Sequence, residues 1–235
     1  MVGPPQVREA RLLAAAETLV LRYGYDKTSV AEVARAAGIS KGAFYLAFAS
    51  KDDLVEELVL RESQAFQVCW SVAARAHPRF GTVGAMYEAM LAAFEERPLM
   101  ARIMRRDAQL LGRYLHRPGN VFERMAAGQP TRGEALAVLQ EAGALRADVD
   151  PAVAAHVINI IAFGLVSLPD FVVAMGTPPP GEVFRFIGQM MDHMLTPEGG
   201  PTEAARAAME KLMQLGEEGL AQLLDARAAE RRSRP

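Results

Sequence analysis

Residues 29–48 contain the pattern that most limits how this chain can fold: two short helical segments separated by a three-residue break. Ser29 and Glu32 have the S-x-x-E spacing of a capping box, which predicts that a helix starts directly after Ser29. The break is Gly38-Ile39-Ser40, where glycine suits a left-handed turn and serine can cap the next helix. Two helices joined in this way form a helix-turn-helix, whose second helix can enter the major groove of DNA.

The second segment, residues 41–47, is predicted to expose side chains whose apolar surface is unfavourable in contact with water. Phe44 and Phe48 are four residues apart, so both can face the core from one side of the helix. The positions left to face outward are Lys41, Gly42, Tyr45 and Leu46. Exposing a tyrosine and a leucine on so short a helix is unfavourable unless a partner covers them.

The distribution of charge supports a nucleic-acid partner for this part of the chain. The whole chain has a net charge of −2, so it has no overall basic field. Residues 1–51, in contrast, contain seven Lys or Arg and four Asp or Glu residues, a local basic excess of the kind found at DNA interfaces. The alternative is a helical hairpin whose lysine and tyrosine side chains are only hydrated.

Helical periodicity continues through the rest of the chain, so the predicted fold class is all-α. Apolar positions recur every three or four residues, Gly or Pro separates the segments, and no alternating β-pattern occurs. The helices expected after the helix-turn-helix cover 51–76, 83–96, 99–112, 118–127, 131–143, 151–175, 181–195 and an amphipathic segment after 198–201.

Several other classes of protein are disfavoured. The run 152–169 is long enough to cross a bilayer, but polar His156 and Asn159 favour a buried or subunit-interface helix instead of a membrane span. The start of the chain lacks an apolar signal segment and Cys69 is the single cysteine, which together fit the cytoplasm. No His, Cys or carboxylate group has the spacing of a catalytic or metal site, so we expect no enzyme activity, metal or cofactor.

At this point the stretch TSVAEVARAAGISKGAFYLAFASKDDL, preceded by AAAETLVLRYGYDK, resembles the N-terminal DNA-binding domain of TetR-family transcriptional regulators. The resemblance covers about residues 8–60. It implies a homodimer with an N-terminal three-helix helix-turn-helix domain at 1–50 and a C-terminal helical domain for effector binding and dimerisation at 51–197. Residues 198–235 are then a linker and a C-terminal amphipathic helix.

The resemblance also implies which residues meet DNA. Phosphate contacts are implied at Thr28, Ser40, Ala43, Tyr45 and Lys51. Contacts to base edges are implied at Lys41, Gly42 and Leu46. The chain departs from the family at Ala47, where members commonly carry His or Tyr, and Ala43 lacks the usual hydroxyl. Lys41 is therefore the only long donor available to a guanine edge.

A methionine-rich stripe in the C-terminal part is the expected effector region. Met86, Met90 and Phe94 repeat every four residues, which is typical of a core, but methionine linings also adapt to apolar ligands. Asn159 could orient a ligand or hydrogen-bond across a helix interface. The full set of expected ligand-binding residues is Phe66, Trp70, Met86, Met90, Phe94, Met100, Met104, Asn159 and Phe163. Because none is charged, we expect a small hydrophobic effector.

The helices expected at 151–175 and 181–195 are apolar on more than one face, which predicts that they pair with a second copy of the chain. The apolar residues concerned are Ile158, Ile161, Phe163, Leu165, Val166, Phe186, Ile187, Met190 and Met194. With the resemblance, these features imply a ligand-responsive regulator, and we expect a repressor that a small apolar effector releases from a palindromic double-stranded DNA operator. The sequence itself does not separate a repressor from an activator. The alternative is a helical enzyme or adaptor that merely contains a helix-turn-helix.

Overall fold

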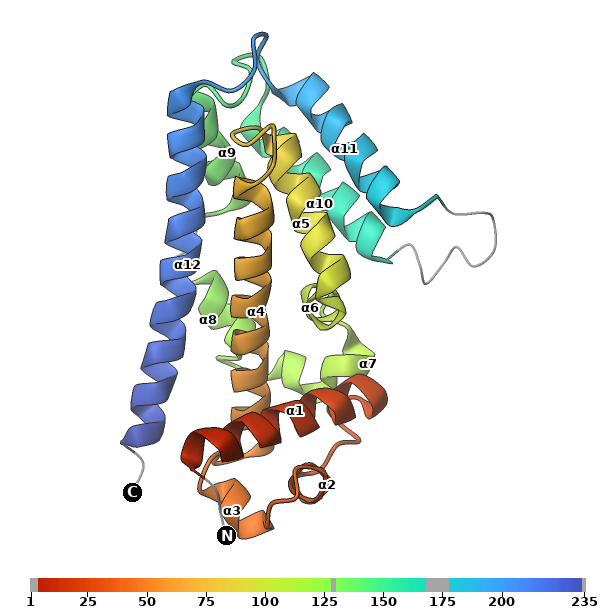
Figure 1. Cartoon of the computed structure of the whole chain (residues 1–235), viewed down its shortest axis with the longest axis vertical. Coiled ribbons are helices and arrows are strands. Elements are labelled where there is room, and N and C mark those ends of the chain that lie inside the picture. The colour runs from red at the N-terminus through yellow and green to blue at the C-terminus, as the bar shows by residue number, and fades with distance from the viewer. Residues whose placement is uncertain (1–3, 128–129, 168–177, 234–235) are drawn as a thin grey trace. The chain divides into compact units, whose positions relative to one another are not determined.

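The computed structural model of the chain describes residues 4–127, 130–167 and 178–233. Every regular element within these ranges is a helix, which confirms the all-α prediction (Figure 1). The helices pack into two compact units. Unit 1 contains the residues up to Gln64, Arg102–Ala127 and the residues from Gly219 onward, and unit 2 contains Ala65–Ala101 and Gly128–Glu218. These two units are defined by packing alone. The DNA-binding, effector-binding and C-terminal ranges expected from the sequence are functional assignments, and they therefore remain predictions.

Three short helices open unit 1, and local signals set their ends. Helix α1 (Pro5–Tyr23) ends at Gly24, whose φ of 80° is a left-handed value that glycine adopts without strain. Helix α2 (Val30–Ala36) begins with the predicted capping box, since Ser29 and Glu32 exchange side-chain and backbone hydrogen bonds. The chain then turns at Gly38 and enters α3 (Lys41–Tyr45), which Ser40 caps. The helix-turn-helix predicted from the sequence is therefore present.

Unit 1 continues with the first half of α4 (Lys51–Arg75) and with segments from later in the chain. The helix expected at 99–112 is divided into α6 (Pro98–Met104) and α7 (Ala108–Leu111). The division occurs because the Asp107 carboxylate accepts from the backbone N–H groups of Gln109 and Leu110, which starts a new helix there. The short elements η1 (Gly112–His116) and α8 (Val121–Ala126) follow.

Unit 2 has an apolar core built from four helices and parts of α4 and α12 (Glu203–Arg232). The four are α5 (Val83–Glu96), α9 (Arg132–Glu141), α10 (Pro151–Ser167) and α11 (Pro180–Leu195). Helices α5 and α11 approach closely: a Cβ atom built on Gly84 would lie 2.1 Å from the carbonyl oxygen of Gly188. Residues 168–175 of the helix expected at 151–175 lie outside the described residues.

Within the described residues, none of the helices combines the length and apolar character that crossing a membrane requires.

Candidate functional site

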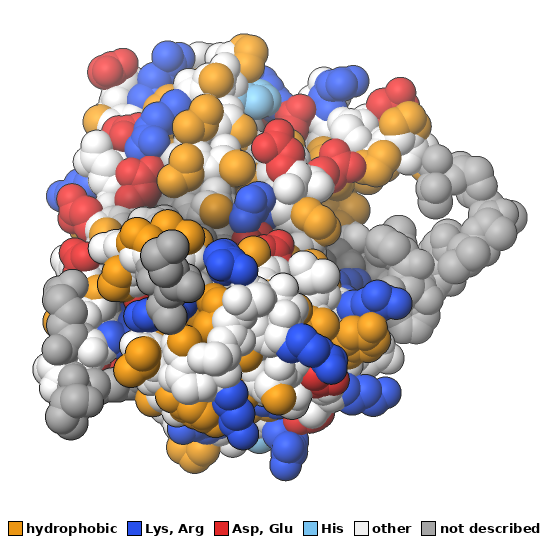
Figure 2. All heavy atoms as spheres, turned by 60° about the horizontal axis from the view of Figure 1, so that its bottom comes forward, with side chains coloured by type: hydrophobic (Ala, Val, Ile, Leu, Met, Phe, Trp, Pro, Cys, Tyr) orange, Lys and Arg blue, Asp and Glu red, His pale blue; other side chains and the backbone are white. Residues whose placement is uncertain are grey.

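The outer surface of α3 carries the side chains that the sequence predicts to be exposed. Phe44 and Phe48 are fully buried, so α3 is fixed with its opposite side outward. On that side Tyr45 is 51% exposed and Leu46 is 75% exposed, and Lys41 and Gly42 are exposed beside them. In the lower part of Figure 2, basic side chains are interspersed with hydrophobic ones and few acidic ones are visible. This surface combines cations with unpaired apolar groups.

Gly42 has an open surface beside it. It does not have a positive φ, and among the described residues no atom lies within 4 Å of a Cβ built on it. The backbone of α3 is therefore open to a partner at this position, which agrees with the implied contact to a base edge.

Two of the implied phosphate-contact side chains are not presented to a partner. Thr28 is buried, and its hydroxyl donates to the Gly24 carbonyl oxygen over 2.9 Å. Ala43 is also buried, because it lies on the same side of α3 as Phe44. Ser40 is exposed, but its hydroxyl oxygen already accepts from the Ala43 N–H at 3.1 Å. The Thr28 hydroxyl thus closes the loop after α1, and Ser40 caps α3, whereas Lys41 and Tyr45 of α3 are exposed.

Lys51 is half-buried and holds the loop between α1 and α2. Its ammonium donates to the carbonyl oxygens of Tyr25 at 2.8 Å and Thr28 at 2.9 Å, and it lies 3.8 Å from the centre of the Tyr25 ring. Burial lowers the pKa of Lys51 below the usual lysine value. Next to it, Asp52 accepts from the Tyr25 hydroxyl and pairs with Arg117. Lys51 therefore has a structural role, whether or not it also meets a phosphate.

Residues of the expected effector region meet between α4 and α5 in unit 2. The Phe66 and Phe94 rings stack with their centres 4.5 Å apart, and the Trp70 indole N–H donates to the Met86 carbonyl oxygen at 3.0 Å. Met90 is half-buried and packs against the same core as Trp70, and Met100 is buried. Phe66 and Phe94 therefore contact each other across α4 and α5, and Trp70, Met86, Met90 and Phe94 pack against the apolar core of unit 2.

Three of the expected ligand-binding residues lie elsewhere. Met104 is 54% exposed and belongs to unit 1. Asn159 and Phe163 are exposed on α10, and Phe163 has 64% of its surface accessible. The sequence also assigns Phe163 to the surface that pairs with a second copy and offers Asn159 a hydrogen bond across a helix interface. A helix that is apolar all round gives no sequence signal for which side faces inward, so the sequence does not separate these assignments.

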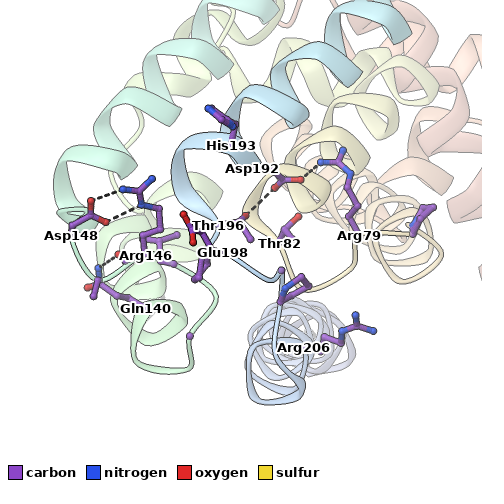
Figure 3. A pocket seen from close by; sticks show the side chains of 17 residues that line it. Arg79, Thr82, Gln140, Arg146, Asp148, Asp192, His193, Thr196, Glu198 and Arg206 are labelled. Atoms are coloured by element: carbon purple, nitrogen blue, oxygen red, sulfur yellow. Dashed lines mark hydrogen bonds and ion pairs between the residues drawn. The ribbon is translucent and has the colours of Figure 1, made fainter.

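A separate pocket of about 1080 Å³, lined by both charged and apolar residues, opens in unit 2 between the start of α5, the loop after α9, the end of α11 and the start of α12 (Figure 3). Its charged groups are largely paired within the protein: Arg79 pairs with Asp192, and Arg146 pairs with Asp148 at 2.6 Å. None of the expected ligand-binding residues lines it. Across the described residues, no group of three or more His, Cys, Asp or Glu side chains could hold a metal ion.

Helices α10 and α11 expose an apolar surface, which we call the α10–α11 face. Phe186 is 68% exposed and Met194 is 61% exposed, far more than apolar side chains of a core helix. Ile158 and Ile187, which the sequence assigns to the same surface, are instead buried within unit 2. The exposed members are Val153, Val157, Ile160, Phe163, Phe186, Met190 and Met194.

Comparison with known proteins adds to this geometry. Residues 12–58 match the family model described as bacterial regulatory proteins, tetR family. Over 41 residues the chain is 51% identical to an uncharacterized HTH-type transcriptional regulator, YwcC, of Bacillus subtilis, and this match covers 17% of the chain. The chain therefore spans only 18% of the length of that curated relative.

Solved structures resemble the chain over most of its length. The fatty acid degradation regulator FadR from Bacillus halodurans matches with a TM-score of 0.58 and 17% identity, over 81% of this chain and 96% of that one. The regulator FadR from Bacillus subtilis, solved in complex with stearoyl-CoA, matches with a TM-score of 0.55 and 14% identity, over 77% and 96%. At these identities the likeness concerns the fold.

Proposed function

We propose that this chain, a transcriptional regulator of the TetR family, is a cytoplasmic homodimeric repressor that a small apolar effector releases from a near-palindromic operator. The observation that carries the proposal is the outer surface of α3. Lys41 can donate to a base edge or a phosphate, while Tyr45 at the end of the five-residue helix and Leu46 directly after it expose large side chains. A DNA groove would cover all three.

Dimerisation is needed because one α3 offers few groups that can read bases. The exposed residues of the α10–α11 face support a second copy as the partner, since two helices from each chain can form a four-helix bundle. Two recognition helices held about 34 Å apart would then meet successive major grooves on one side of the duplex. This spacing predicts two inverted half-sites in the operator.

The effector proposal rests on the apolar region between α4 and α5. Phe66, Trp70 and Phe94 form its aromatic part, and Met86 and Met90 can change shape around a ligand. The structural neighbour solved with stearoyl-CoA supports a ligand with a long apolar chain. Because α4 is one helix that carries both Lys51 and Trp70, a ligand that displaces its second half should disturb its first turn. A 100-fold loss of operator affinity requires about 2.7 kcal/mol of coupling.

The test begins with selecting a duplex from random-sequence DNA with the full-length chain and measuring its affinity by fluorescence anisotropy. Acyl-CoAs of increasing chain length, free fatty acids and planar aromatic compounds are then titrated while the emission of Trp70, the only tryptophan, is recorded. We expect one class of compound to quench the emission of Trp70 and to weaken operator binding. Operator DNA should weaken the binding of that compound by the same factor. If no duplex is enriched, DNA recognition is refuted. If a duplex is enriched but no compound changes its affinity, only the effector proposal fails.

A further inference from the structure

The last turns of α12 pack against the start of α4 within unit 1, and the contact is made by buried charges. In the part of α12 that belongs to unit 1, the inward positions change along the helix from leucine to arginine. Leu220, Leu223 and Leu224 are half-buried, and Arg227 and Arg231 continue the same stripe. The first two turns of α4 carry the acidic partners: Asp53, Glu56 and Glu57, all of them buried.

Arg227 is the centre of this contact. It is only 8% exposed, and its guanidinium lies 2.5 Å from an Asp53 carboxylate oxygen and 2.9 Å from a Glu56 carboxylate oxygen. It also donates to the Asp53 carbonyl oxygen at 3.2 Å. Glu56 pairs in addition with Arg124 of α8 at 2.9 Å. The first turn of α4 is thus held by arginines from two distant segments of the chain.

Arg231 extends the contact to Phe48, three residues beyond the end of α3. Its guanidinium pairs with Glu57 at 2.8 Å and lies 5.3 Å from the centre of the Phe48 ring. Asp53, which Arg227 holds, accepts from the Ala49 N–H at 2.8 Å. Both arginines therefore act on the connection between α3 and α4, where the orientation of α3 is set.

Stability alone does not account for arginines at these positions. The desolvation of a buried ion pair offsets most of its Coulomb attraction, and apolar side chains of similar volume often stabilise a core equally well. Leucines would extend the stripe that Leu220 and Leu224 begin. Ion pairs with fixed geometry instead select one arrangement of two helices.

We propose that Arg227 and Arg231 are positioning residues for DNA binding, which hold α4 and the α3–α4 connection so that the outer surface of α3 fits its groove. They also offset the negative charge of Asp53, Glu56 and Glu57, which would otherwise repel phosphates close to the recognition helix. This inference rests on the proposed operator binding and assigns a role to the C-terminal end of α12.

The test compares Arg227→Met/Arg231→Met with wild type on the duplex that the wild-type chain selects from random-sequence DNA. We expect the affinity to fall at least about tenfold, a change of about 1.4 kcal/mol, while helicity, Trp70 emission and dimer mass stay unchanged. The matched control is Arg75→Met. Arg75 joins α4 to α12 through Glu210 at 2.9 Å and Glu217 at 3.1 Å, but it does so in unit 2. The control should keep wild-type affinity.

Two further measurements separate positioning from general stability. Hydrogen exchange of the amides of residues 44–50 should be faster in the double methionine variant and unchanged in Arg75→Met, and this comparison requires no DNA. Arg227→Lys/Arg231→Lys keeps both charges but loses the planar guanidinium groups, so its affinity should lie between those of the double methionine variant and the wild type. If the lysine variant loses as much affinity as the methionine variant, the loss does not come from charge pairing and the inference is wrong.

Wild-type affinity in a folded Arg227→Met/Arg231→Met chain would overturn the inference while leaving the proposed function intact. If that chain loses its helicity, the single variant Arg231→Gln tests the inference instead. Arg231 lies at the rim of the contact, with 12% of its side chain exposed, so its replacement should disturb folding less. A folded Arg231→Gln chain should bind several-fold more weakly, and unchanged affinity would contradict the role of Arg231. Failure of the wild type to select any duplex would refute the proposed function, and hydrogen exchange would still test the positioning.

Discussion

Gly42→Ala should change the stability of the free protein and its affinity for operator in opposite directions. Gly42 is the second residue of α3, it does not have a positive φ, and a Cβ there would meet no atom within 4 Å. In a helix interior, alanine is favoured over glycine by about 0.8–1 kcal/mol. Because α3 has only five residues and Gly42 lies in its first turn, we expect the free energy of unfolding to rise by about 0.5 kcal/mol.

The same methyl group is unfavourable in the complex. It projects from the surface that we propose to lie against DNA, so a groove that closely contacts the glycine backbone would have to accommodate an added methyl group. Forcing one such group into a close-packed contact costs about 1–3 kcal/mol. Each subunit of the dimer contributes one Gly42, so the loss for the whole operator is about 2–6 kcal/mol if the two half-sites are independent. Operator binding should therefore weaken by at least about 30-fold.

Urea unfolding followed by circular dichroism measures the first effect, and fluorescence anisotropy on the selected duplex measures the second. The matched control is Gly216→Ala in α12, where a Cβ would make ordinary contact with the Gln67 amide at 3.6 Å. The control should gain stability in the same way and retain its affinity. If Gly42→Ala raises the unfolding midpoint but binds operator as tightly as wild type, the outer surface of α3 does not lie close against DNA and our assignment of the interface is wrong.

Three further predictions concern separate parts of the chain. Lys41→Ala should relax the preference at one base pair by about 1–3 kcal/mol, measured on singly substituted duplexes, and equal weakening on all sequences would contradict base reading by Lys41. Phe186→Asp/Met190→Asp should yield monomers in light scattering that no longer hold operator, whereas a soluble variant that stays dimeric would exclude the α10–α11 face as the interface. The side-chain hydrogen bond from Arg75 lowers the pKa of Glu210 below 4.5, so this pair should stabilise the chain above that pH and lose its contribution as the pH falls further. Arg75→Met should remove this part of the pH dependence of thermal unfolding. The free energy of unfolding should change by no more than about 1 kcal/mol, because the pair is partly exposed. An unchanged pH profile would show that the pair is not formed.

The features that the sequence predicted correctly depend on residues close together in the chain. The capping box of Ser29 and the inward placement of Phe44 and Phe48 follow from spacings of three or four residues, and the structure has all of them. The orientation of α10 could not be predicted, because its apolar residues surround the helix and tertiary packing alone decides that Ile158 is buried and Phe163 exposed.

The contact between α12 and α4 was beyond prediction for a different reason. Arg227 and Asp53 are 174 residues apart. Their local contacts, which join Arg227 to Glu230 and Asp53 to the Ala49 N–H, do not signal this pairing. The available signal was the position of Arg227 and Arg231 on the same helical stripe as Leu220 and Leu224, which marks them as inward-facing. Such a stripe shows that a partner exists but does not identify it.

The inclusion of residues from Gly219 onward in unit 1 has a consequence for the order in which the protein becomes active. A ribosome releases the recognition helix early, while the segment that carries Arg227 and Arg231 is among the last parts of this sequence to be translated. A nascent chain can form α1, α2 and α3 from local signals, but it lacks the arginines that pair with Asp53 and Glu57. A fully ordered connection between α3 and α4 is therefore expected only on chains in which the segments of unit 2 have already been synthesised, so that shorter nascent chains would not compete for the proposed operator.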